Sequence, residues 1–85
     1  QADVSLPFDA RLNKGTDRRN FTVTVRAGGA SIDRVRETVR FEATGYCLNS
    51  FGGSDTRWDI DPVTNDWAFR RAGENMIFSG RCTAR

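Results

Sequence analysis

The residues of this chain that could do chemistry are two cysteines and eleven acidic residues, because the sequence contains no histidine. Without histidine, neither a serine–histidine nor a cysteine–histidine pair can activate a nucleophile. A glycoside hydrolase needs only two carboxyl groups at a suitable separation. No spacing among the acidic residues singles out such a pair, and a chain of 85 residues leaves little room for a substrate cleft. We therefore expect no enzyme and no catalytic residue, and a small hydrolase using paired carboxylates is the least favoured hypothesis.

One group of oxygen-bearing side chains suggests a metal site: Asp55, Asp59, Asp61, Asn65 and Asp66. Carboxylates in a loop can bind calcium. Counted from Asp59, however, Thr64 and Arg70 stand where an EF-hand loop has Gly and Glu. Strand alternation also places Asp59 and Asp61 on the solvent side. We therefore predict no metal site and no cofactor.

The two cysteines, Cys47 and Cys82, allow one intramolecular disulfide. They form no Cys-x-x-Cys motif that would depress a thiol pKa, so a structural disulfide is favoured over a redox-active pair. A disulfide, together with the absence of an initiator Met before Gln1, favours an exported protein, either periplasmic or secreted. Two buried thiols in a cytosolic protein are the alternative. No apolar run approaches the ~18–20 residues that span a bilayer.

The stretch Ser31–Phe51 is predicted to form one amphipathic helix. Its apolar stripe consists of Ile32, Val35, Val39, Ala43, Tyr46 and Cys47. On a helical wheel these residues fall within about 60° of Ile32, which is typical of a core-facing helix. Ser31 suits an N-cap and Gly52 suits the position just after the helix.

The residues 38–47 also fit a strand, because apolar and polar residues alternate there and several are β-branched. In a helix Phe41 would point away from the core, and Gly45 would cost roughly 1 kcal/mol relative to Ala. We favour the helix, since the stripe runs unbroken from Ile32 to Cys47 and a strand of that length would be unusual.

Alternating apolar and polar residues predict five strands. They span residues 6–12, 20–27, 57–61, 66–71 and 76–82. The side chains predicted to face inward are Leu6, Phe8, Ala10 and Leu12 in the first strand, Phe21, Val23, Val25 and Ala27 in the second, Trp58, Ile60, Trp67 and Phe69 in the next two, and Met76, Phe78, Gly80 and Cys82 in the last. Numbered along the chain, the sheet order that keeps all neighbours antiparallel is 2-1-5-4-3.

These elements predict an α+β fold in a single domain, residues 1–85. One helix packs on one face of a mostly antiparallel five-stranded sheet, in the order strand-strand-helix-strand-strand-strand. The inward stripe of the helix includes Cys47, and the inward side of the last strand includes Cys82. A helix laid across the sheet brings both sulfurs to the same side, as a Cys47–Cys82 disulfide requires.

The outer face of the predicted sheet is rich in arginine. It exposes Arg11, Arg26, Arg57, Arg70 and Arg81, with Thr22, Thr24 and Ser79 between them. Such a face could hold an acidic protein, a phosphorylated glycan or nucleic acid. Sheets that bind single-stranded nucleic acid carry aromatic side chains on the binding face, where bases stack on them. In this chain the alternation predicts that the aromatic side chains point inward, so nucleic acid is disfavoured. For this face taken alone we favour a solvated surface, with Arg and Asp paired across strands and Asp9, Asp59 and Asp61 neutralising the arginines.

The back of the predicted helix is a second candidate surface. Phe41, Leu48 and Phe51 lie off the core stripe, with Gly45 between the first two. An exposed apolar patch beside a glycine suits a partner helix or a homodimer contact. The alternatives are that N-terminal residues cover this patch or that the region is a strand.

The favoured function is a small exported, non-enzymatic protein-binding domain, for example an inhibitor or an accessory protein. Its candidate partner-binding residues are Phe41, Leu48, Phe51, Arg11, Arg26, Arg57, Arg70 and Arg81. The alternative is an anion-binding module for glycan or nucleic acid through the arginine-rich face. A net charge of only +2 does not by itself indicate a nucleic-acid partner.

Overall fold

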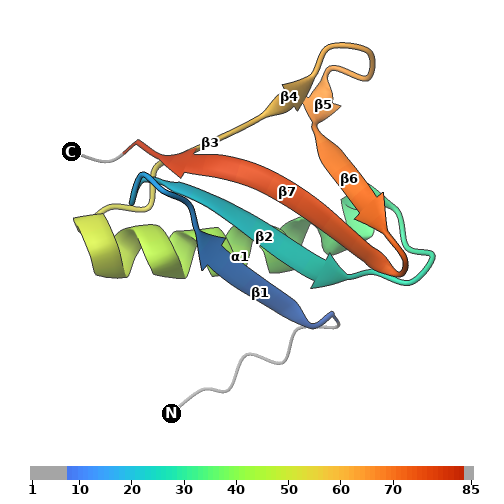
Figure 1. The fold of residues 1–85 in the computed structure, drawn as a ribbon, viewed down its shortest axis with the longest axis horizontal. Coiled ribbons are helices and arrows are strands. Elements are labelled where there is room, and N and C mark those ends of the chain that lie inside the picture. The colour runs from blue at the N-terminus through green and yellow to red at the C-terminus, as the bar shows by residue number, and fades with distance from the viewer. Residues whose placement is uncertain (1–7, 84–85) are drawn as a thin grey trace.

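A single long helix, α1 (Ile32–Phe51), lies across one face of a sheet in the computed structural model, which describes residues 8–83 (Figure 1). The helix-facing core includes five buried residues of α1: Val35, Thr38, Val39, Ala43 and Cys47. This confirms the predicted helix and excludes the strand alternative for residues 38–47. Ser31 occupies the N-cap position, although its side chain makes no capping hydrogen bond. Gly52 ends the helix in the left-handed conformation, and its N–H donates to the carbonyl of Leu48.

The main sheet has five strands, and every pair in it is antiparallel. They are β1 (Ala10–Lys14), β2 (Asn20–Arg26), β3 (Thr56–Trp58), β6 (Phe69–Ala72) and β7 (Asn75–Cys82). β1 pairs with β2, β2 with β7, and both β3 and β6 pair along the other edge of β7. The α+β architecture is confirmed. Leu6, where the first strand was predicted to begin, lies outside the described residues.

The predicted strand order is wrong in two respects. It placed the first strand beside the last, whereas β2 takes that central place, with Val23 opposite Phe78, and β1 forms an edge. It also placed the fourth strand between the third and the last, whereas β3 and β6 both pair directly with β7. Between its exposed end residues β2 alternates fully buried and half-buried residues, whereas no residue of β1 is fully buried. The more apolar strand therefore occupies the centre, where both neighbours and the helix shield it from water.

The third and fourth predicted strands each break in two. β4 (Ile60–Asp61) and β5 (Asp66–Trp67) leave the main sheet and pair only with each other, as a hairpin that projects from its edge (Figure 1). The break falls at Asp59, whose N–H donates to the carbonyl of Ser79 in β7 and whose carbonyl accepts from Ala68. The hairpin therefore begins where the chain exchanges β7 for a new partner.

This break overturns two predicted core positions. Ile60 is 52% exposed and Phe69 is 41% exposed, although alternation had placed both inward. Trp58 and Trp67 do pack against the core, with their rings stacked and the centroids 4.5 Å apart. Because the chain turns out of the sheet at Asp59, a continuous alternation no longer describes which side chains face the helix.

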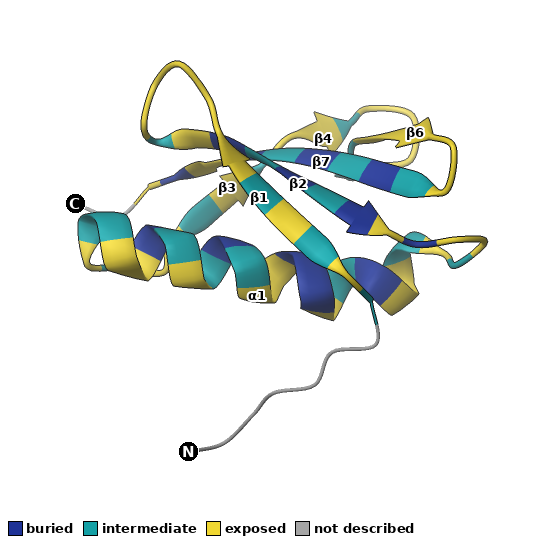
Figure 2. Cartoon of the chain, turned by 60° about the horizontal axis from the view of Figure 1, so that its bottom comes forward, coloured by how far each residue is buried: buried dark blue, intermediate teal, exposed yellow. Residues whose placement is uncertain are grey.

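The hydrophobic core lies between α1 and the helix-facing sides of β2 and β7 (Figure 2). Phe21, Phe78 and Met76 are its largest fully buried side chains. The disulfide Cys47–Cys82 joins the helix to β7 within this core, with both residues fully buried. The predicted disulfide is thus confirmed, and it covalently fixes the helix against the sheet that carries the candidate surfaces.

Candidate functional site

The face of the main sheet that points away from α1 is covered by no element of residues 8–83 (Figure 2). We call it the open face. It comprises the strand positions whose side chains alternate with the core: Arg11, Asn13, Asn20, Thr22, Thr24, Arg26, Arg57, Arg70, Asn75, Ile77, Ser79 and Arg81. All five arginines predicted for this surface therefore lie on it, together with the predicted Thr and Ser residues.

Strand register arranges the centre of the open face as a neutral floor between charged ends. Arg11 lies opposite Thr24, Thr24 opposite Ile77, and Ile77 opposite Arg70, so one row crosses four strands. Thr24 and Ile77 are half-buried, and the two arginines at the ends are exposed. An apolar or neutral centre with a charged rim is the usual anatomy of a protein–protein contact.

Two of the hollows in the open face border this floor at Thr22 and Ser79. One, of about 320 Å³, is lined by Thr22, Asp59, Ala68, Phe69, Arg70, Ile77 and Ser79. The other, of about 400 Å³, is lined by Gly15, Asn20, Phe21, Thr22, Arg57, Asp59, Ser79, Gly80 and Arg81. Thr22, Asp59 and Ser79 border both. Small hydroxyl side chains thus form the bottom of a surface whose borders carry arginine.

The arginines of the open face differ in their partners. Arg26 forms an ion pair with Glu74 at 3.3 Å, and Arg81 forms one with Asp17 at 3.4 Å. Arg11, Arg57 and Arg70 have no ion pair within residues 8–83.

Neutralisation by Asp9, Asp59 and Asp61 was predicted for this face taken alone, but none of the three forms an ion pair with these arginines in the described part of the chain. Asp17 contributes instead. The backbone N–H of Arg19 donates to its carboxylate, Arg81 approaches it as well, and both lower the pKa of Asp17. Three guanidinium groups consequently remain available to an external anion.

The aromatic residues lie elsewhere. Trp58, Trp67 and Phe78 form a chain of ring contacts on the helix side, with Phe21 at one end of it. None of the strand positions that define the open face is aromatic, although Phe69 and Phe21 contribute to the lining of the two hollows. The strand positions therefore lack the row of stacking platforms that single-stranded nucleic acid uses.

The back of α1 presents the second predicted surface. Phe41 is 50% exposed and Leu48 is 48% exposed, and the exposed Gly45 stands between them along the helix. Phe51 is placed apart from this pair. It packs against the core, with Tyr46 at its edge and the guanidinium of Arg19 4.5 Å from its ring centre. The structure thus brings together two of the three predicted apolar residues.

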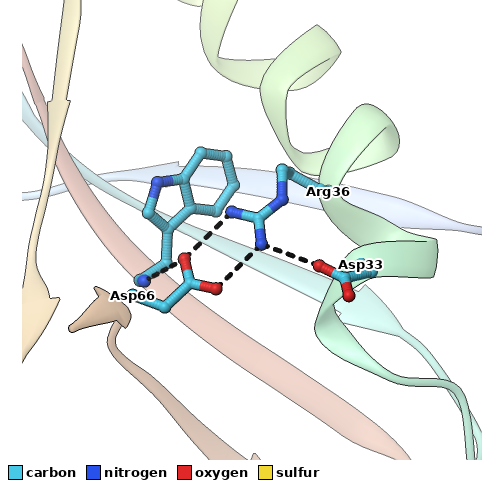
Figure 3. Close-up of polar contacts among 4 residues, drawn as sticks. Asp33, Arg36 and Asp66 are labelled. Atoms are coloured by element: carbon cyan, nitrogen blue, oxygen red, sulfur yellow. Dashed lines mark hydrogen bonds and ion pairs between the residues drawn. The ribbon is translucent and has the colours of Figure 1, made fainter. Parts of the chain in front are cut away.

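Two of the acidic residues considered as metal ligands, Asp61 and Asp66, make hydrogen bonds that hold the hairpin. Asp61 accepts a hydrogen bond from the N–H of Val63 at 2.8 Å, within the hairpin loop. Asp66 binds Arg36 of α1 through both carboxylate oxygens, while Arg36 also binds Asp33 (Figure 3). No three Cys, Asp or Glu side chains in residues 8–83 are grouped so that they could hold a metal ion.

The hydrogen bonds between Arg36 and Asp66 shift the pKa of each residue. The two hydrogen bonds that Arg36 donates to Asp66, and a further one from the N–H of Trp67, lower the pKa of Asp66. Asp66 first, and Asp33 second, raise the pKa of Arg36. The guanidinium also lies 4.7 Å from the ring centre of Trp67. Asp66 is therefore held as a charged structural residue rather than poised as a proton donor.

Four residues of the open face were not singled out from the sequence: Asn13, Asn20, Asn75 and Ile77. Ile77 occupies its centre, and Asn20 stands beside Arg81, whose Nη1 donates to the Asn20 side chain at 2.9 Å. The alternation of the last strand already gave Ile77 outward parity. Its central place, however, depends on β7 having strands on both sides, which alternation does not reveal.

Comparison with models of protein families, with curated proteins and with solved structures gives no match. Within residues 8–83, α1 is the one helix, and it is too polar to cross a membrane.

Proposed function

We propose that this protein is a non-enzymatic protein-binding domain whose binding site is the open face. Its partner carries acidic residues placed around an apolar contact. One observation supports this most directly: Arg11, Arg57 and Arg70, without carboxylate partners in residues 8–83, surround a half-buried floor of Thr22, Thr24, Ile77 and Ser79. Apolar contact at the centre contributes affinity, and charge complementarity at the rim contributes specificity and association rate.

A protein partner suits this surface better than a polyanion. Asp59 lies among the arginines, and Arg26 and Arg81 are already paired with carboxylates. A nucleic acid or sulfated glycan would meet these acidic groups with like charge, whereas a protein can place a polar or basic group opposite each of them. The absence of aromatic residues from the open face supports the same choice.

The place of action follows from the disulfide. Cys47 and Cys82 are bonded to each other in the core, and such bonds persist in oxidising compartments. We therefore place the domain outside the cytoplasm, in the periplasm or among secreted proteins. A stapled core also suits a small domain that must present a fixed surface to a partner.

The test begins with the immobilised chain and an extract of the organism that makes it. A protein retained from the extract is identified by mass spectrometry and purified, and its affinity for the chain is then measured by calorimetry at two salt concentrations. Three variants accompany the wild type. Arg11→Gln/Arg70→Gln removes two unpaired charges from the open face, Arg34→Gln/Arg40→Gln removes the same charge from α1, and Phe41→Ser/Leu48→Ser removes the apolar patch of the helix.

The proposal expects the open-face variant to bind the identified partner about tenfold more weakly or worse, and the α1 variants to bind as the wild type does. It is overturned if the open-face variant retains full affinity, or if the loss appears with Phe41→Ser/Leu48→Ser. A parallel column of immobilised heparin separates the anion-binding alternative. Retention that falls steeply with salt and is lost with Arg11→Gln/Arg70→Gln would favour that alternative over a protein partner.

A further inference from the structure

The row Asn20, Arg81 and Arg57 crosses the open face near one end, on three adjacent strands. Arg81 is the direct cross-strand partner of Asn20 in β2 and of Arg57 in β3. Side chains directly opposite each other have Cβ atoms about 4.5–5.5 Å apart. Two guanidinium groups therefore start from neighbouring positions on the same side of the sheet, an arrangement that destabilises a sheet when nothing separates the charges.

The two arginines are not equivalent. Arg81 is oriented by two acceptors on the side of β2, since its Nη1 donates to Asn20 at 2.9 Å and approaches Asp17 at 3.4 Å. The side chain of Arg57, on the other side, makes no hydrogen bond or ion pair within residues 8–83. The sheet thus holds one fixed guanidinium and one available guanidinium beside the same hollow of about 400 Å³.

The charged residues that line this hollow determine the charge of the anion that it can bind. Arg57 and Arg81 contribute two positive charges and Asp59 one negative charge, so the lining is singly positive. Thr22 and Ser79 add hydroxyl groups that can donate hydrogen bonds. Asp17, outside the lining, forms an ion pair with Arg81 at 3.4 Å and offsets its charge, so Arg57 carries the charge of this pair that has no carboxylate partner in residues 8–83. A monovalent planar anion matches this single unpaired charge and the fork of the Arg57 guanidinium, whereas a dianion would exceed the charge.

We infer that the hollow between Arg57 and Arg81 is the anchor subsite of the open face and receives the side-chain carboxylate of an Asp or Glu residue of the partner. Arg57 binds the carboxylate, and Arg81, held in place by Asn20 and Asp17, is the neighbouring guanidinium beside the same hollow. This inference rests on the proposed function and specifies its chemistry, because it states which group of the partner is bound and where. It also gives the arginine pair a role, since the bound carboxylate relieves the repulsion that the empty face bears.

The experiment uses a defined probe, the blocked peptide acetyl-Glu-Glu-Glu-amide, titrated into the isotope-labelled chain at low ionic strength and followed by NMR. We expect saturable shifts of the amide signals of Asn20, Arg57 and Arg81. Affinity should fall about fivefold or more in Arg57→Gln and remain unchanged in Arg34→Gln, an equal loss of charge on the helix. Full affinity in Arg57→Gln, or shifts confined to other residues, would overturn the inference.

Two further probes test the kind of anion. The peptide acetyl-Gly-Gly-Gly with a free terminal carboxylate should bind more weakly than the glutamate peptide, and so should inorganic sulfate. Equal or tighter binding of the first would assign the subsite to a chain terminus, and equal or tighter binding of sulfate would assign it to dianions. Either result overturns the side-chain assignment.

Thermal unfolding at low salt supplies an independent measurement. Because Arg57→Gln removes a cross-strand repulsion, its Tm should equal or exceed that of the wild type, and a lower Tm would contradict the inference. If Arg57→Gln does not change the affinity of the glutamate peptide while Arg11→Gln/Arg70→Gln still weakens partner binding, the anchor subsite is wrong and the proposed function stands. If partner binding is insensitive to all of these arginines, the proposed function itself fails.

Discussion

Arg36 and Asp66 join the helix to the projecting hairpin through two parallel hydrogen bonds, of 3.1 and 2.9 Å. The pair comes from α1 and β5, which are separated in the chain by the turn after the helix and by β3 and β4. The same guanidinium lies over Trp67, and Trp67 stacks on Trp58 at the border of the core. Among the described strands the hairpin strands pair only with each other, so the hairpin is held from the helix side by Arg36 and by the contacts of Trp67, and β6 continues from it into the main sheet.

The substitution Asp66→Asn should make the Tm of the protein depend less on pH in the acidic range. The pKa of Asp66 is lowered from its ordinary value of 3.8, so its charge stabilises the folded state above that pH. This contribution is lost as the pH falls through the lower folded-state pKa. Thermal unfolding between pH 2 and pH 7 should show a lower Tm for Asp66→Asn at neutral pH and a difference that shrinks below about pH 4. Asp55→Asn, an equal change at an exposed residue, is the control, and a constant difference for Asp66→Asn across the range would contradict the prediction.

Removing the disulfide with Cys47→Ala/Cys82→Ala should lower the free energy of unfolding by about 3–4 kcal/mol, on the chain-entropy model. The bond closes a loop between residues 35 apart in the sequence, and both cysteines are fully buried. Urea denaturation of the variant and of the wild type, with and without reductant, provides the measurement. Reductant should leave the unfolding curve of the variant unchanged, because the variant has no disulfide. In the wild type the bond is buried, so reductant should break it only after the chain unfolds. A loss below about 1 kcal/mol would show that packing alone holds α1 on the sheet.

Gly80→Ala should destabilise the fold by about 1–3 kcal/mol, because a Cβ at this position would stand 2.8 Å from the Phe21 ring and 3.0 Å from the Trp58 ring. Phe21 and Trp58 flank Gly80 across β2 and β3, and their rings meet over it, with centroids 5.5 Å apart.

Gly45→Ala is the matched control for that substitution. Its Cβ would meet nothing within 4 Å, and α1 should gain about 1 kcal/mol from the better helix former. Urea denaturation should therefore move the two variants in opposite directions, and a shift in the same direction would refute the steric argument.

Thr38→Val should raise the free energy of unfolding by about 1 kcal/mol. The Thr38 hydroxyl is buried and has no hydrogen-bond partner in the described residues, so its desolvation is uncompensated. Valine keeps the shape and removes the unpaired group. Val39→Thr, which places a second hydroxyl in the same core, should lower stability. Equal stability of the wild type and Thr38→Val would indicate that the hydroxyl finds a partner in solution.

The parts of the fold that could be predicted were those encoded by local periodicity. The stripe from Ile32 to Cys47 specified both the helix and its buried side, and alternation placed Phe78 and Cys82 on the core side of the last strand. With two cysteines in the sequence, only one intramolecular pairing was available. The same alternation placed all five arginines on one face, because neighbouring residues of a strand point to opposite sides.

The remaining features depend on contacts between residues far apart in the chain. Local pattern assigned Ile60 and Phe69 to the core, but the exchange of partners at Asp59 turned the chain out of the sheet and exposed both. The order of the strands was likewise decided by tertiary packing: the more apolar strand β2, and not β1, lies beside β7, with a neighbouring strand at each edge and the helix on one face.

For this protein, then, the sequence by itself determined which side of each regular element is apolar, where the helix lies and which cysteines are joined. The tertiary structure alone decided which arginines acquired carboxylate partners, that Ile77 lies at the centre of the open face, and that Arg57 stands opposite Arg81. The reason is physical. Periodicity records the direction in which a side chain points, whereas pairing and register depend on the packing of the whole core, which no short segment of the chain contains.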